Sequence, residues 1–114
     1  MLTLYGIPNC DTCRKARRWL EERGIDHCFH DLRRDGLDTA ILQTWADALG
    51  WERLLNRQSN TWRQLPEADR TVADREAAIA LLAHHPTLLK RPLLARDGAY
   101  QLGFRPADYE AFCS

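Results

Sequence analysis

Two cysteines in the segment Cys10-Asp11-Thr12-Cys13 are the residues of this chain best suited to chemistry. They follow the apolar run Leu2–Ile7 and stand where a helical pattern begins. The free N–H groups and partial positive charge of a helix N-terminus, together with nearby Arg14 and Lys15, favour a thiolate over a thiol. We therefore expect Cys10 to be a nucleophile. Cys13, one helical turn later, is within reach to resolve a disulfide.

Two other uses of a cysteine pair at this spacing are half of a zinc site and a pair of unreactive thiols. A structural zinc site needs two further ligands at suitable spacing. The nearest candidates, His27, Cys28 and His30, alternate along an expected strand and cannot all face one ion. We therefore expect no metal. We expect Cys28 to be a small buried hydrophobic residue and the two histidines to lie at the strand surface or partly in the core.

Length and composition limit the classes of protein to which this chain can belong. Its 114 residues suffice for one compact domain, which we expect over 1–114. The 16 basic residues equal the 16 acidic ones, so no overall field attracts nucleic acid or an anionic membrane. No window approaches the roughly 18 apolar residues of a membrane span. We expect a cytoplasmic monomer, whose four cysteines are redox-active or buried rather than a disulfide framework.

Hydrophobic periodicity and turn signals predict alternating strands and helices. A strand, a helix and a second strand at the start imply a parallel pair with a right-handed crossover. Asp97-Gly98 predicts the positive-φ turn of a hairpin. The predicted strands are residues 2–6, 26–32, 92–95 and 99–102; the predicted helices are 11–23, 39–49 with Asp38 as its cap, short pieces within 52–65, 71–84, and 106–112.

Three segments resemble the ArsC/Spx family, most closely its YffB branch. They are Tyr5–Ala16, which contains both cysteines, Leu89–Leu94 with its Arg-Pro pair, and Leu102–Pro106, which reads Leu-Gly-Phe-Arg-Pro. The resemblance spans essentially the whole chain. It implies an α/β fold of the thioredoxin-like class, with a mixed sheet built from β-α-β, a helical insertion, a β-hairpin and a last helix.

The same resemblance implies roles for particular residues. Cys10 would be the nucleophile, and Arg91 would line its pocket next to a cis Pro92. Arg105 and Arg57 would bind anionic groups of the substrate. The topology supports part of this assignment, because the first strand of the hairpin begins beside the end of the first strand and brings Arg91 next to Cys10. A guanidinium there stabilises a thiolate and presents a fork of donors to a carboxylate.

We therefore expect a glutathione-dependent thiol-disulfide oxidoreductase. Cys10 would form a mixed disulfide with a disulfide or oxidised substrate, and glutathione or Cys13 would resolve it. Its partners would be glutathione as co-substrate and a further thiol or disulfide substrate, without nucleic acid or membrane. Arsenate reduction is one alternative. It is disfavoured because the arsenate reductases that the chain resembles have a histidine and a serine where this chain has Gly6 and Cys13. The other alternative is an Spx-like redox-sensing regulator that binds RNA polymerase.

Overall fold

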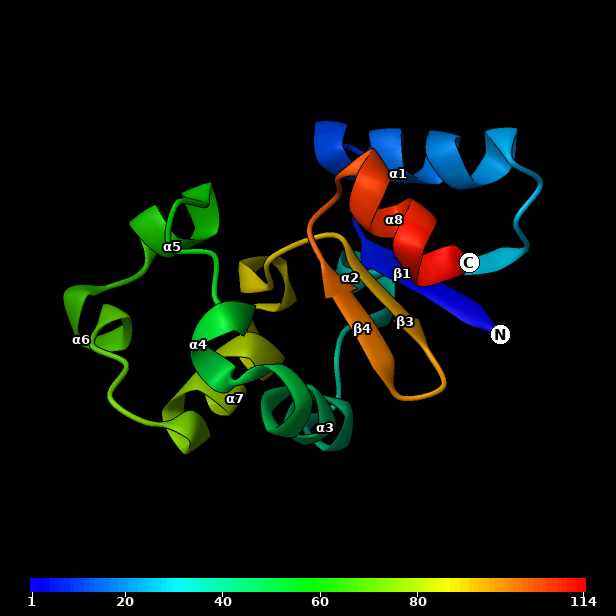
Figure 1. Cartoon of the computed structure of the whole chain (residues 1–114). Helices are drawn as coiled ribbons and strands as arrows, with labels where there is room; N and C mark the ends of the chain where they lie inside the picture. The colour runs from blue at the N-terminus through cyan, green and yellow to red at the C-terminus, as the bar shows by residue number, and fades with distance from the viewer. The chain divides into compact units, whose positions relative to one another are not determined.

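The computed structural model describes all 114 residues and shows a mixed α/β fold. The chain divides into two compact units. Residues 1–32 and 91–114 form the first, which we call the sheet unit. Residues 33–90 form the second, which we call the helical unit. The first unit thus joins the two ends of the chain, drawn in blue to cyan and in orange to red, around one sheet (Figure 1).

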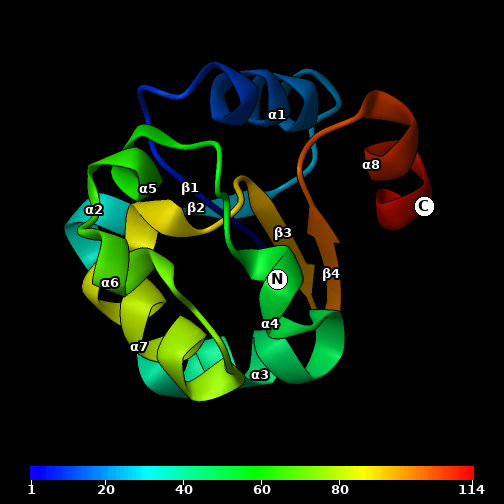
Figure 2. The ribbon, with the colours of Figure 1, turned by 90° about the vertical axis from the view of Figure 1, so that its left-hand side faces the viewer.

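A four-stranded sheet with the order β2-β1-β3-β4 organises the sheet unit. β1 (Leu2–Gly6) pairs in parallel with β2 (His27–Asp31) and antiparallel with β3 (Leu93–Arg96). β4 (Ala99–Leu102) lies beside β3 at the other edge (Figures 1 and 2). The parallel pair and the mixed sheet confirm the predicted topology, which places the end of β1 next to the start of β3.

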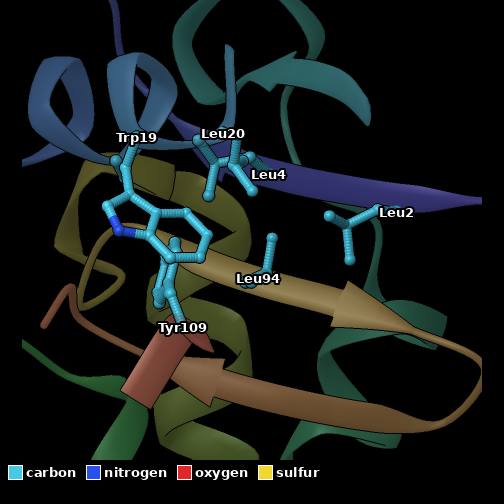
Figure 3. Close-up of a cluster of buried hydrophobic side chains, with 7 residues drawn as sticks. Leu2, Leu4, Trp19, Leu20, Leu94 and Tyr109 are labelled. Carbon is cyan, nitrogen blue, oxygen red and sulfur yellow. The ribbon is translucent and has the colours of Figure 1, made fainter. Parts of the chain in front are cut away.

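One face of the sheet carries the hydrophobic core of this unit. Leu4 of β1 pairs with Phe29 on one side and with Leu94 on the other. Two helices supply the rest of the core, α1 (Asp11–Glu22) with Trp19 and Leu20, and α8 (Pro106–Cys113) with Tyr109 (Figure 3). The rings of Trp19 and Tyr109 meet edge to face, with centroids 5.7 Å apart. This packing fixes α1, and therefore both cysteines, over the sheet.

The hairpin between β3 and β4 turns as its sequence predicts. Asp97 has a φ of 48° and Gly98 a φ of 83°. Two successive positive φ values match the right-handed twist of the flanking strands, and Asp-Gly adopts them at low cost. The turn therefore sets the register in which Leu93 faces Leu102.

The helical unit consists of short helices and contains no strand of the sheet. Its largest pair is α3 (Thr39–Leu49) and α7 (Arg75–His84), which lie side by side (Figure 2). Arg75 joins them through the carboxylate of Asp47, at 2.5 Å, and the backbone carbonyl of Gln43, at 3.1 Å. The other helices are α2 (Leu32–Asp35), α4 (Trp51–Leu54), α5 (Asn60–Gln64), α6 (Glu67–Arg70) and the 3₁₀ turn η1 (Pro86–Leu88).

Several predicted element boundaries differ from the structure by one residue, and the start of one helix differs by four. The helix predicted over 71–84 begins at Arg75, because Asp74 caps it by accepting a hydrogen bond from the backbone N–H of Ala77 at 2.8 Å. The second strand ends at Asp31, and Leu32 opens the short helix α2. Asp38 does cap α3 as predicted, by accepting from the N–H of Ile41.

The expectation that Cys28 is buried is also wrong, since its side chain is exposed. Cys28 lies on β2, the edge strand of the sheet. Successive side chains of a strand point to opposite faces, so the packing of Phe29 against the core turns Cys28 away from it.

A helix that crosses a bilayer must be both long and apolar, and none of the helices of the chain meets both conditions.

Candidate active site

Cys10 is the N-cap residue of α1, immediately before its first turn. Its backbone is extended, with φ −115° and ψ 124°, and its carbonyl accepts the first helical hydrogen bond from the N–H of Arg14 at 2.9 Å. The side chain is half-buried. Cys10 therefore presents its sulfur at the N-terminus of a twelve-residue helix, where the helix dipole favours a negative charge.

The surroundings of Cys10 stabilise its thiolate. Burial raises the pKa of this thiol, but hydrogen bonds from the backbone N–H and the thiol of Cys13 oppose that effect. The guanidinium of Arg91 adds a hydrogen bond and a positive charge. The net pKa of Cys10 lies below the ordinary value of a cysteine thiol, which increases the fraction present as the nucleophilic thiolate near neutral pH.

Cys13 has the opposite character. Its side chain is fully buried, and this burial, together with the neighbouring charge and hydrogen bond of Cys10, raises its pKa to about 12. The backbone N–H of Ile7 and the charge of Arg91 reduce the shift without cancelling it. Two cysteines three residues apart therefore differ in kind, because the pKa of Cys10 is lowered toward the thiolate, whereas Cys13 is a buried thiol in hydrogen-bond contact with it.

Arg91 and Pro92 reach the cysteines from the far end of the chain. The Arg91–Pro92 peptide bond is cis, as the resemblance implies. Pro92 is buried, and its carbonyl accepts a hydrogen bond from the N–H of Gly103 at 2.9 Å. β3 begins at the next residue and pairs with β1, where Leu93 faces Tyr5. Strand pairing thus delivers Arg91 to Cys10, as expected from the topology.

Two of the predicted site residues, Arg105 and Arg57, are not among the groups that shift the pKa of Cys10. Arg105 is the exposed residue that precedes α8. Arg57 belongs to the helical unit, in the segment between α4 and α5, where its guanidinium lies 5.6 Å from the ring centroid of Trp62. The binding roles of both arginines stay predictions.

Comparison with known proteins identifies the family. Residues 5–112 match the ArsC family. The chain belongs to this family. The similar solved structures include that of a protein named YffB, with 40% identity, a TM-score of 0.92 and coverage of 97% of both chains. An arsenate reductase (ArsC) related protein from Brucella melitensis is 48% identical with a TM-score of 0.76, over 98% of this chain and 93% of that one.

A regulator is also among the relatives of this ArsC-family chain. The global transcriptional regulator Spx of Streptococcus pyogenes is 32% identical, over 100% of this chain and 86% of its own length. The ArsC-family neighbours have a thioredoxin-like fold, and the sheet order and helix placement described above are those of the same fold. The predicted family and fold class are therefore confirmed.

The remaining thiols and histidines do not assemble a second centre in this ArsC-family chain. Cys113 is half-buried in α8, and burial raises its pKa while the charge of Arg96 lowers it. His30 lies against the ring of Tyr5, with centroids 4.8 Å apart. Nowhere do three or more histidine, cysteine, aspartate or glutamate side chains converge as metal ligands would.

Sequence reasoning missed Gly6 and Tyr109, both of which adjoin Cys13. Tyr109 is fully buried, and burial followed by the charges of Cys13 and Cys113 raises its pKa. Gly6 ends β1 directly beside the Cys13 sulfur. A glycine inside a strand often marks a close approach of another group, so the sequence did carry a signal for Gly6. No sequence signal connects Tyr109 to Cys13, because only the packing of α8 brings them together.

Proposed function

We propose that this protein is a glutathione-dependent thiol-disulfide oxidoreductase in which Cys10 is the catalytic nucleophile. The observation that carries the proposal is the pairing of a thiolate-stabilised Cys10 with the guanidinium of Arg91 at the start of α1. A thiolate, and not a thiol, attacks disulfides. The cytoplasm, which is rich in reduced glutathione, is the compartment that suits this reaction.

The proposed reaction begins with attack of the Cys10 thiolate on one sulfur of a disulfide substrate. A mixed disulfide with Cys10 forms, and the other half of the substrate leaves as a thiolate that takes up a proton. A second thiol then attacks the Cys10 sulfur, forms a new disulfide with it and releases the reduced product. Either glutathione or Cys13 supplies this thiol. Further glutathione reduces this new disulfide, which restores the Cys10 thiolate and completes the formation of glutathione disulfide. Two electrons pass to the substrate in each cycle, and glutathione provides them, becoming glutathione disulfide.

Arg91 has two tasks in this scheme. Its charge and hydrogen bond hold Cys10 as a thiolate. The planar fork of a guanidinium also suits a carboxylate, and glutathione carries two of these. Pro92 has no N–H, so it leaves the peptide backbone of glutathione free to lie along this segment. We assign Arg105 and Arg57 to the remaining anionic groups of glutathione or the substrate, from the family resemblance.

The test is reduction of a low-molecular-weight disulfide coupled to glutathione and glutathione reductase. Cys10→Ser should lose at least about a thousandfold in rate, because a serine hydroxyl does not ionise near neutral pH. Cys28→Ser is the matched control, since Cys28 is exposed and lies apart from the groups that tune Cys10. A Cys10→Ser enzyme that kept the wild-type rate would refute the assignment.

Cys13→Ser separates the two routes of resolution. If glutathione resolves the mixed disulfide, activity survives this change; if Cys13 resolves it, activity falls. Peptide mapping after treatment with glutathione disulfide identifies the intermediate directly. A glutathione adduct on Cys10 is expected in the Cys13→Ser protein, where the competing thiol is absent.

A second candidate function is that of a redox-switched transcription regulator that senses oxidation through Cys10 and Cys13. It is suggested by the similarity of the whole chain to the regulator Spx. A redox-switched regulator would capture an RNA polymerase subunit in one redox state, so a pull-down with oxidised and reduced protein tests that role. Arsenate reduction is tested with purified protein, glutathione and glutaredoxin. Turnover of arsenate at a rate above that of disulfide reduction would replace the proposed activity.

A further inference from the structure

Gly6 is a glycine that the backbone does not require. The five other glycines of the chain all have positive φ values, where a side chain is strained. Gly6 has no positive φ and lies buried at the end of β1, in an extended conformation that most residues adopt. The reason for a glycine here must therefore lie in the space around it.

That space is filled by Cys13. A Cβ atom added to Gly6 would lie 2.6 Å from the Cys13 sulfur and 3.4 Å from the Cys13 Cβ. Non-bonded carbon atoms attract one another best at roughly 3.5–4.0 Å, and sulfur is larger than carbon. The ring of Phe29 closes the same space, with Cε1 at 3.6 Å. Because Cys13 is fully buried, its sulfur has little room to withdraw.

Two hydrogen bonds hold the sulfur of Cys13 in this space. The backbone N–H of Ile7, the residue after Gly6, donates a hydrogen bond to it, and Cys10 also forms a hydrogen bond with it. The contact with Cys10 also stabilises the thiolate of that residue. A side chain at position 6 would push the sulfur away from the position in which it makes both hydrogen bonds.

We propose that Gly6 is a positioning residue for the dithiol route, since it leaves the space that seats the Cys13 sulfur against Cys10. The inference rests on the proposed function and adds that Cys13 is the resolving thiol. Cys13 loses its proton to the departing substrate sulfur and attacks the Cys10 sulfur of the mixed disulfide. The Cys10–Cys13 bond forms, the bond to the substrate breaks, and the substrate leaves as a thiol. Two molecules of glutathione then reduce the internal disulfide and become glutathione disulfide.

The test follows a single turnover of protein whose Cys10 already carries a mixed disulfide with one glutathione. Free glutathione is absent. Release of glutathione reports the attack by Cys13. The Gly6→Ala variant should release glutathione at least about tenfold more slowly than the wild type. Its Cys10 pKa, measured by the ultraviolet absorbance of the thiolate, should rise, because the displaced thiol of Cys13 no longer donates a hydrogen bond to Cys10.

The control is Gly6→Ala made in a Cys13→Ala background, where residue 13 has no sulfur. In a Cys13→Ala background the contact at 2.6 Å is absent. The contacts at 3.4 Å with the Cβ of residue 13 and at 3.6 Å with Phe29 remain, and small shifts relieve them. Adding Gly6→Ala to Cys13→Ala should therefore leave the Cys10 pKa unchanged. A general structural effect of the alanine would move this pKa equally in both backgrounds, and that result would overturn the inference.

The remaining outcomes are also decisive. Release of glutathione from Gly6→Ala at the wild-type rate would overturn the inference while the proposed function stands. Failure of the Cys13→Ser protein to form a mixed disulfide with glutathione on Cys10 would remove the proposed function and the inference with it. If Gly6→Ala does not fold, recovery of folding in the double variant with Cys13→Ala supports the shared space, and continued failure contradicts it.

Discussion

The two compact units of this chain differ in what they can contribute to chemistry. The sheet unit contains all four cysteines, the whole sheet and Arg91. The helical unit contains no cysteine. Of the residues predicted to form the site, only Arg57 belongs to it. Every group that sets the pKa of Cys10 lies in the sheet unit.

This difference indicates which part of the chain lowers the pKa of Cys10. The groups that lower the pKa of Cys10 come from both ends of the chain, which strand pairing joins, and none of them belongs to the helical unit. The expected division is that changes in the sheet unit alter the reactivity of Cys10, whereas changes in the helical unit alter stability or substrate binding. The following experiments test that division.

The largest contrast should be between the two cysteines of the same helix. At pH 7 a thiol with a pKa of about 12 is ionised in only about one molecule in 10⁵, so we expect iodoacetamide to modify Cys10 at least about a thousandfold faster than Cys13. Because the pKa of Cys10 is lowered, its reactivity should persist below the ordinary thiol range and disappear only as the pH falls through the lowered value. Mass spectrometry of peptides measures both rates. Similar rates for the two cysteines would contradict the contrast.

A pair of core changes compares the units in stability. Leu94 in the sheet unit and Leu82 in the helical unit are both fully buried. Leu94→Ala and Leu82→Ala should each lower the free energy of unfolding by about 2–5 kcal/mol, measured by urea denaturation. At a temperature where the protein stays folded, Leu82→Ala should leave the Cys10 pKa unchanged. A raised Cys10 pKa in that variant would show that the helical unit does tune the thiolate.

Arg91→Ala should raise the Cys10 pKa and slow its alkylation at pH 7 by about tenfold or more, since a hydrogen bond to a charged group contributes about 1.5–3 kcal/mol. Arg91→Lys keeps the charge without the planar fork, so an intermediate rate is expected. Arg105→Ala is the matched control in the same unit and should leave the pKa unchanged. An unaltered pKa in Arg91→Ala would remove the basis of the proposed mechanism.

The smallest effect is expected from Arg57→Ala. Arg57 is exposed, and exposed charge pairs contribute at most about 1 kcal/mol, so the KM for glutathione should rise by no more than about fivefold. Neither kcat nor the Cys10 pKa should change. Steady-state kinetics at several glutathione concentrations separate these quantities. A change in kcat or in the Cys10 pKa, with KM unaffected, would place Arg57 in a different role.

Local signals in the sequence predicted much of the fold. The Asp97-Gly98 turn, the Asp38 cap and the cysteine pair at the start of α1 each depend on a few neighbouring residues, and all were found where expected. The start of α7 was missed because Asp74 and the residues before it offer competing helix signals, and only the cap hydrogen bond selects one. The exposure of Cys28 was missed because it depends on β2 being an edge strand.

The sequence alone determined that Cys10 stands at a helix N-terminus and that an Arg-Pro pair precedes a hairpin, since both follow from short-range patterns. Only the tertiary structure decided how the two cysteines differ. Burial of Cys13, the approach of Arg91 from the far end of the chain and the space left by Gly6 arise from contacts between distant segments. A pKa depends on the groups and solvent within a few ångströms of the ionising atom, and that neighbourhood exists only once the strands have paired.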